Sequence, residues 1–256
     1  MANSSMTRRS SDGLVENIKT IVYAILIALV VRTVAFEPFT IPSGSMESTL
    51  LVGDYVFVSK YSYGYSRYSI PFAPPLFSGR IFGKEPQRGD VAVFRLPRDP
   101  TIDYIKRIVG LPGDTVQMKG GQLYLNRKLV PRQPVGEAIS TDQQLQTMVR
   151  TYREILPVEG NPAGRPHIVQ KMYDKGGLND TEEFLVPAGH FFAMGDNRDN
   201  SSDSRDPTGG VGFVPMENLI GRAEFIWLSI DLTDPWWQVW DWPFEVRWSR
   251  LLSAIR

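Results

Sequence analysis

The sequence has no cysteine and only two histidines, His167 and His190, among 256 residues. Disulfides, thiolate metal ligands, a cysteine nucleophile and a Cys-x-x-Cys redox pair are therefore excluded. Because 28 Lys and Arg balance 28 Asp and Glu, the chain also lacks the positive field of a nucleic-acid-binding protein. Phosphate-loop, calcium-loop and zinc-peptidase motifs are missing as well, so we predict no metal, no cofactor and no nucleic-acid partner. We expect His190 to be structural and His167 to lie on the surface.

The N-terminal region contains a long apolar segment. It has eleven uninterrupted apolar positions, Ile21–Val31, and extends to 17 positions over residues 20–36 if Arg32 places its charge at a membrane interface. A spanning helix needs about 20 mostly apolar residues, so a signal peptide and a core helix are the alternatives. Because no good signal-peptide cleavage site follows, we favour a retained transmembrane anchor at residues 20–36.

The charges that flank this segment predict its orientation. Arg8, Arg9 and Lys19 precede it, whereas residues 37–56 carry no Lys or Arg. Basic flanks stay on the cytoplasmic side of a membrane. We therefore expect residues 1–19 in the cytoplasm and the body of the chain outside.

Beyond the anchor, short apolar runs bounded by Gly, Pro, Asp or Asn indicate β-strands. These runs are residues 55–58, 91–94, 122–125, 184–186, 191–194 and 225–228. Gly120-Gly121 is typical of a hairpin turn, and only residues 141–153 have the pattern of a short helix. We predict a mainly β fold, in which a transmembrane helix precedes an antiparallel all-β body with a smaller inserted β subdomain.

Composition divides this body into parts. Residues 37–118 are its first part, with a Tyr-rich and Pro-rich insertion at 61–87, and residues 187–256 are its second part. The smaller subdomain lies between them at 119–186, and we expect the polar stretch 132–175 to be loosely packed.

Four segments place polar residues in apolar, turn-bounded surroundings: Ile41–Met46, Arg88–Phe94, Asp103–Asp114 and Gly195–Arg205. A Ser beside Gly is usually a turn residue and a Lys on a strand is usually exposed. Burial on a strand would nevertheless lower the pKa of Lys106 and make its amine a general base for a serine nucleophile. In this order the segments resemble the motifs of bacterial type I signal peptidases, which are membrane-bound Ser/Lys proteases. The similarity extends from the apolar segment to about Ile230.

The resemblance implies roles for four residues. Ser45 corresponds to the nucleophile and Lys106 to the general base. Ser201 corresponds to the Ser that orients the lysine, and Ser43 to a residue that helps the Ser45 backbone N–H stabilise the oxyanion. The implied activity is removal of signal peptides from exported preproteins by cleavage after small residues at positions −1 and −3.

Other residues match support and pocket positions of that family. The charged residues that would hold the last segment against the lysine strand are Arg107, Asp196, Arg198, Asp203 and Arg205. The apolar residues that would line shallow substrate pockets are Phe39, Ile41, Pro42, Val93 and Ile105. The alternatives are a solvated charged loop for the first set and core packing for the second.

The resemblance also implies partners and a location. The partners are signal peptides of exported preproteins, membrane lipid and the secretion machinery. The location is the bacterial cytoplasmic (inner) membrane, with a single span and the catalytic body on the periplasmic side. Five of the six Trp lie between Trp236 and Trp248, which is typical of a membrane interface, with β-core or a short amphipathic helix as alternatives.

One departure from the family concerns Glu47-Ser48, because family members commonly carry Pro at position 48. We expect its loss to loosen the backbone after Ser45 and to place a negative charge beside the substrate. Two other functions are weighed: a non-catalytic, membrane-tethered peptide-binding β module, and a self-cleaving Ser/Lys regulatory protease. The intact set of Ser45, Lys106 and Ser201 argues against the first, and the lack of a helix-turn-helix before Ser45 argues against the second.

Overall fold

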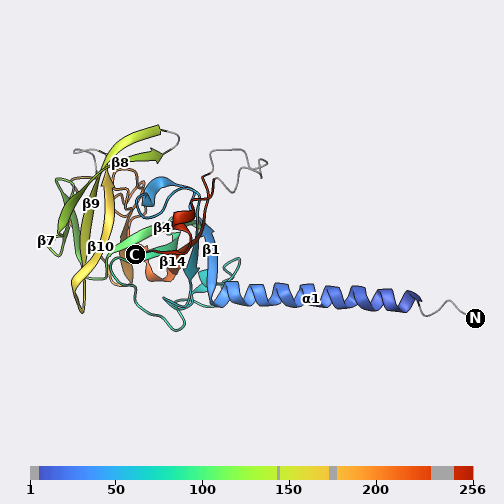
Figure 1. Ribbon diagram of the computed structural model, residues 1–256. Helices are drawn as coiled ribbons and strands as arrows, with labels where there is room; N and C mark the ends of the chain where they lie inside the picture. Colours follow the sequence, from blue (N-terminus) through green and yellow to red (C-terminus); the bar gives the residue numbers. More distant parts are fainter. Residues whose placement is uncertain (1–5, 143–144, 173–177, 232–244, 256) are drawn as a thin grey trace, which may run out of the picture.

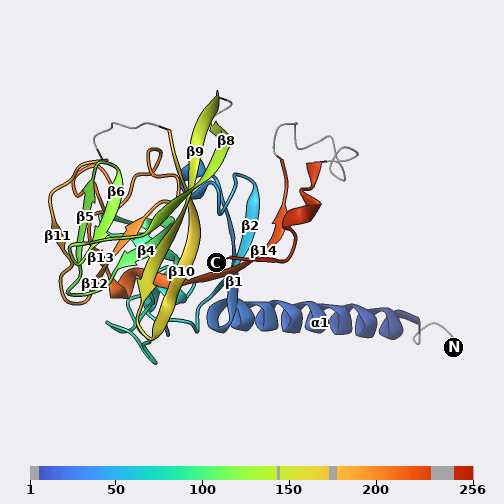
Figure 2. The ribbon, with the colours of Figure 1, turned by 60° about the vertical axis from the view of Figure 1, so that its left-hand side comes forward.

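The computed structural model describes residues 6–142, 145–172, 178–231 and 245–255 (Figure 1). Its first element is helix α1 (Met6–Val34), which extends away from the rest of the molecule (Figures 1 and 2). The segment Val15–Val34 has a mean hydropathy of 1.7, and none of it is buried inside the protein. The helix is long and apolar enough to cross a membrane, and the alternative of a core helix is wrong.

The main sheet has eight antiparallel strands. Their spatial order is β1 (Phe36–Thr40), β2 (Asp54–Ser59), β14 (Leu219–Ser229), β3 (Val91–Leu96), β4 (Asp99–Gly110), β12 (His190–Met194) and β13 (Val214–Pro215), while β15 (Ser253–Ala254) pairs with β14. Strand β14 comes late in the chain yet lies between β2 and β3, so distant parts of the sequence build one sheet. In the pairing of β3 with β4, Lys106 of β4 lies opposite Ala92 of β3.

A second sheet consists of three long strands in the order β10-β9-β8. These strands are β8 (Arg132–Asp142), β9 (Leu145–Val158) and β10 (Asn161–Lys171). The predicted helix at 141–153 is therefore wrong, because the β-branched residues Thr147, Val149 and Thr151 of β9 pair with β8, and Thr151 also pairs with β10. Several described residues of the stretch expected to be loosely packed are buried, among them Val149, Leu156 and Val169, so that expectation is wrong for them.

A third sheet has the order β11-β5-β6-β7. Its strands are β11 (Phe184–Leu185), β5 (Thr115–Lys119), β6 (Gln122–Leu125) and β7 (Lys128–Leu129). The predicted hairpin turn joins β5 to β6, where Gly120 and Gly121 have φ angles of 55° and 70°. Such positive values are accessible to glycine without steric cost.

The described residues also form four short 3-10 turns: η1 (Gly44–Met46), η2 (Arg67–Ser69), η3 (Met216–Asn218) and η4 (Trp248–Arg250). Turn η1 is anchored in the core, because Met46 and Leu50 are fully buried in an apolar cluster with Val56, Val93 and Ile226. The mainly β fold predicted from the sequence is confirmed. The Trp-rich stretch falls largely on residues 232–244, which lie outside the described residues.

Candidate active site

The Ser45 hydroxyl lies on turn η1, directly after β1. Two groups of Asn197 hold this turn: the side-chain amide donates to Gly44 O at 3.0 Å and the backbone N–H donates to Ser45 O at 3.2 Å. The neighbouring Met46 side chain is buried in the core. Because the turn is held from both sides, the position of Ser45 Oγ is well defined.

The amine of Lys106 meets this hydroxyl from β4. Its Nζ donates to Ser45 Oγ at 2.5 Å, and the lysine is only 3% exposed. Burial lowers the pKa of Lys106 from 10.5 to about 8, against the opposing effect of the Asp203 and Asp196 carboxylates. At neutral pH about one molecule in ten then carries the free amine, which is able to accept a proton.

Both groups face a groove of about 570 Å³. All five of the predicted pocket residues line it, from β1 and the following turn on one side and from β3 and β4 on the other: Phe39, Ile41, Pro42, Val93 and Ile105. Residues that were not predicted from the sequence also line the groove, among them Ile102 and Tyr104 of β4 and Asn200 and Ser202 of the Gly195–Arg205 segment. The groove is thus a largely apolar channel with the hydroxyl and the amine in its wall.

The two remaining predicted serines lie close by. Ser43 Oγ is 3.5 Å from Ser45 Oγ. Ser201 Oγ is buried, but within the described part of the chain it has no hydrogen-bond partner, so its role in orienting Lys106 stays a prediction. A Cβ on Gly195 would come within 2.5 Å of Ser45 O and 2.2 Å of Ser201 Oγ, so only glycine fits between the two serines.

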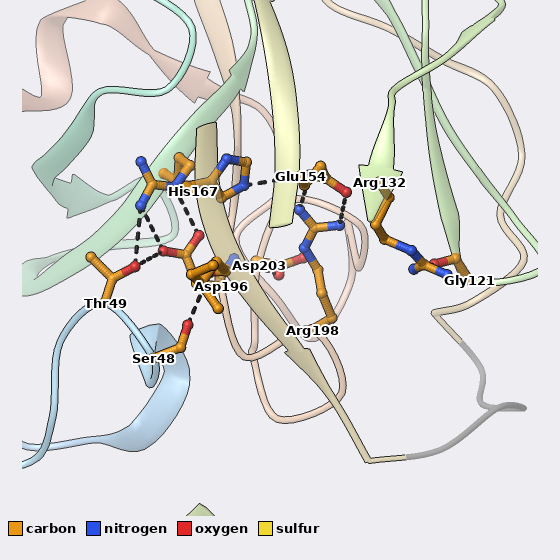
Figure 3. A network of polar contacts seen from close by, with 12 residues as sticks. Ser48, Thr49, Gly121, Arg132, Glu154, His167, Asp196, Arg198 and Asp203 are labelled. Carbon is orange, nitrogen blue, oxygen red and sulfur yellow. Dashed lines mark hydrogen bonds and ion pairs between the residues drawn. The ribbon is translucent and has the colours of Figure 1, made fainter. Parts of the chain in front are cut away.

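Buried ion pairs join the lysine strand to the Gly195–Arg205 segment. Arg107, next to Lys106, contacts both carboxylate oxygens of Asp196, at 2.8 and 2.7 Å. Thr49 also donates to Asp196 at 2.5 Å (Figure 3). Within the segment, Arg205 pairs with Asp203 at 2.8 Å. The four charged side chains are buried, so the alternative of a solvated loop is wrong for them.

Arg198 has a partner that the sequence analysis missed. It pairs with Glu154 of β9, and both residues are buried (Figure 3). Burial alone would raise the pKa of Glu154, but Arg198 and His167 outweigh it and hold the pKa below its usual value. The sequence contained one signal for burial of Glu154: Glu154 and Leu156 are two residues apart, as on one face of a strand. Because a helix was predicted for residues 141–153, no strand was expected to continue through Glu154.

The prediction for His167 was wrong. This histidine is 5% exposed and lies on β10 with Nε2 3.4 Å from Glu154. Burial, together with the nearby Arg107, lowers its pKa. His190, by contrast, places Nδ1 3.0 Å from Ala188 O, a local backbone contact.

Comparisons with known proteins identify the family of this chain. Residues 14–228 match the family described as "Signal peptidase, peptidase S26". Signal peptidase I of Rickettsia typhi is 45% identical over 84% of this chain and 80% of its own length, and that of Rickettsia massiliae is 46% identical over 84% and 79%. A solved signal peptidase I from Enterococcus faecalis V583 is 26% identical, with a TM-score of 0.31, over 54% of this chain and 97% of its own.

The protein is therefore a serine endopeptidase. The chain belongs to the signal peptidase family, peptidase S26.

Replacing Lys106 by Met should stabilise the folded protein at pH 7. A pKa lowered to about 8 means that the buried charged amine costs about 3 kcal/mol, whereas Met fills the same space without charge. Because the folded protein loses this proton near pH 8 and the unfolded chain only near pH 10.5, the penalty fades as pH rises through that interval. Urea unfolding in detergent measures the free energy of unfolding of Lys106→Met and of the unchanged protein at pH 7 and at pH 10. Lys128→Met, an exposed lysine on β7, should change neither value, and a Lys106→Met protein that is less stable at pH 7 would contradict the expectation.

Replacing Glu154 by Ala should destabilise the protein by about 3–5 kcal/mol, because the buried Arg198 guanidinium loses its carboxylate. The double variant Glu154→Met, Arg198→Leu should recover most of the loss, since no buried charge is then left unpaired. Urea unfolding followed by tryptophan fluorescence tests both variants. The control is Glu159→Ala, an exposed residue between β9 and β10, and equal stability of the Glu154 variant and this control would refute the assignment.

Proposed function

We propose that this protein is a membrane-anchored signal peptidase that uses Ser45 as nucleophile and Lys106 as general base to cut signal peptides from exported preproteins. The observation that carries the proposal is the 2.5 Å contact between a buried amine and a hydroxyl in the wall of an apolar groove. Histidine is not needed for this chemistry, because a desolvated lysine has a pKa close to neutral.

The reaction has two halves. Ser45 Oγ forms a bond to the carbonyl carbon at the cleavage site while Lys106 Nζ takes its proton. The C–N bond of the peptide then breaks as Lys106 returns that proton to the leaving amine, and an ester on Ser45 remains. Water then forms a bond to the ester carbonyl carbon while Lys106 Nζ takes its proton. The C–Oγ bond breaks as Lys106 returns that proton to Ser45 Oγ, which releases the signal peptide and restores both residues.

Charge on the carbonyl oxygen needs donors during both halves. The Ser45 backbone N–H and the Ser43 hydroxyl are proposed as these donors, a role consistent with the 3.5 Å separation of the two serine hydroxyls. Removing one such donor typically slows the reaction by about a hundredfold or more. Ser201 is proposed to orient the lysine during the reaction, for which its burial beside Gly195 is favourable.

The groove supports specificity for small side chains at positions −1 and −3. Its apolar walls come from residues that are packed into the body, such as Val93 and Ile105, and these side chains are proposed to exclude large substrate side chains by overlap. Discrimination by such a pocket is worth about 1–3 kcal/mol per misfitting group.

Helix α1 is proposed to cross the bacterial cytoplasmic membrane once, with the N-terminus in the cytoplasm and the body on the periplasmic side. Its apolar surface supports a membrane span, and the basic residues Arg8, Arg9 and Lys19 in its N-terminal part support this orientation. Membrane lipid and the secretion machinery are then its neighbours, and residues 37–118 and 187–256 form the catalytic part around the inserted 119–186.

Ser45→Ala and Lys106→Met should each abolish cleavage of a preprotein with Ala at −1 and −3, because each removes one half of the pair. Cleavage by the detergent-solubilised full chain is measured by gel and mass spectrometry, with Lys128→Met as the active control. An intact preprotein with the unchanged enzyme would favour a peptide-binding module, and shortening of the enzyme itself would favour a self-cleaving regulator.

The rate should rise with pH and level off above an apparent pKa of about 8, because only the uncharged Lys106 accepts the serine proton. The pH dependence of kcat/KM between pH 6 and 10 measures this value. A rate that is independent of pH through this interval would show that another group accepts the proton.

A further inference from the structure

Glu47, two residues after Ser45, is buried rather than presented to the groove. It is 9% exposed, and it is not among the residues that line the groove. Its carboxylate accepts hydrogen bonds from Ser140 Oγ of β8 and, at 3.1 Å, from Gln170 Nε2 of β10. The expectation that Glu47 places negative charge beside the substrate is therefore wrong, because side chains from β8 and β10 of the second sheet bind the carboxylate.

Gln170 also contacts the opposite side of the site through its backbone. Its N–H donates to Asp196 O at 2.9 Å, and its carbonyl accepts the Arg198 N–H at 3.0 Å. Asn197, between those two residues, donates to Ser45 O. These hydrogen bonds connect the Ser45 turn through Glu47 and Gln170 to the Gly195–Arg205 segment. Asn197 of that segment binds Ser45 in turn, so the connection returns to its starting point.

A second attachment follows at Ser48. Its φ angle is 87°, which proline, fixed near −65°, does not adopt. Ser48 Oγ donates to Ile168 O of β10 at 2.9 Å (Figure 3). The chain after the serine is therefore not loosened by the absence of Pro, because two side chains attach it to β10 instead.

We propose that Glu47 is a positioning residue for cleavage. Its carboxylate, through Gln170, fixes the Ser45 turn relative to the Gly195–Arg205 segment and so keeps Ser45 Oγ within reach of Lys106 Nζ. This inference rests on the proposed function of Ser45 and Lys106. It assigns a catalytic purpose to the second sheet, which contributes no side chain to the groove wall among the described residues.

Steady-state kinetics on a preprotein substrate test the proposal with three variants. Glu47→Ala should lower kcat about tenfold or more with KM changed less than about twofold, because the groove is intact but the hydroxyl is misplaced. Glu47→Gln should recover most of kcat, since its amide oxygen still accepts the bonds from Ser140 and Gln170. Glu137→Ala, an exposed residue of β8, is the matched control and should behave as the unchanged enzyme.

Hydrogen exchange gives a readout that does not depend on activity. In Glu47→Ala, amides of residues 44–50 and of 195–205 should both exchange faster, whereas those of β5 and β6 should not. If the unchanged enzyme does not cleave preproteins, the proposed function fails while this coupling is still measurable. Four results would each overturn the positioning role. Two concern the variants: an unchanged kcat in Glu47→Ala, or a loss of kcat in Glu47→Gln equal to that in Glu47→Ala. The others are a loss of kcat that the unfolded fraction of the variant explains, and hydrogen exchange that accelerates at only one of the two segments.

Discussion

The contact between the Lys106 amine and the Ser45 hydroxyl imposes the main constraint on this protein. An ammonium group is poorly accommodated there, because burial removes its water and lowers its pKa to about 8. The free amine is accommodated well, and it is the form that accepts a proton. Under the proposed function the buried amine is the general base, so a local loss of stability at neutral pH accompanies that base and the rest of the fold has to hold Lys106 in place.

Unpaired carboxylates close to the Lys106 amine would raise its pKa and so favour the charged form. Asp203 and Asp196 both act to raise the pKa of Lys106. Each is already paired with a guanidinium, Asp203 with Arg205 and Asp196 with Arg107, at 2.8 and 2.7 Å. These pairs serve a second purpose beside fixing the Gly195–Arg205 segment: by neutralising the carboxylates they leave desolvation as the dominant effect on the lysine.

Much of the fold and the centre of the site were predictable from the sequence because their signals are local. Short apolar runs bounded by turn residues mark strands such as β3 and β12, and the neighbours of Ser45 and Lys106 carry the family pattern. The partners of Arg198 and Glu47 were not predictable, because Glu154, Ser140 and Gln170 come from strands that pair only in the folded chain. The prediction that His167 lies on the surface was wrong for the same reason, because its position depends on strand pairing. A proline-rich neighbourhood indicates a surface loop unless a sheet covers it.

The junction between α1 and β1 is also fixed by side-chain contacts, some of them between residues that are distant in the sequence. Glu37, at the start of β1, pairs with Arg32 of α1 at 2.6 Å and with the buried Lys60 at 2.8 Å. Tyr65 of the Tyr-rich insertion donates to Val34 O, the last residue of α1, at 2.7 Å. The end of the helix is thus joined to the body by side chains as well as by the chain. Since β1 leads from this junction to the Ser45 turn, the nine-residue step from Phe36 to Ser45 keeps the Ser45 hydroxyl within about 30 Å of Phe36, the first residue of β1. If α1 crosses the membrane, only a peptide bond held close to the membrane surface reaches Ser45, so the length and fastening of β1 contribute to the choice of substrate together with the shape of the groove.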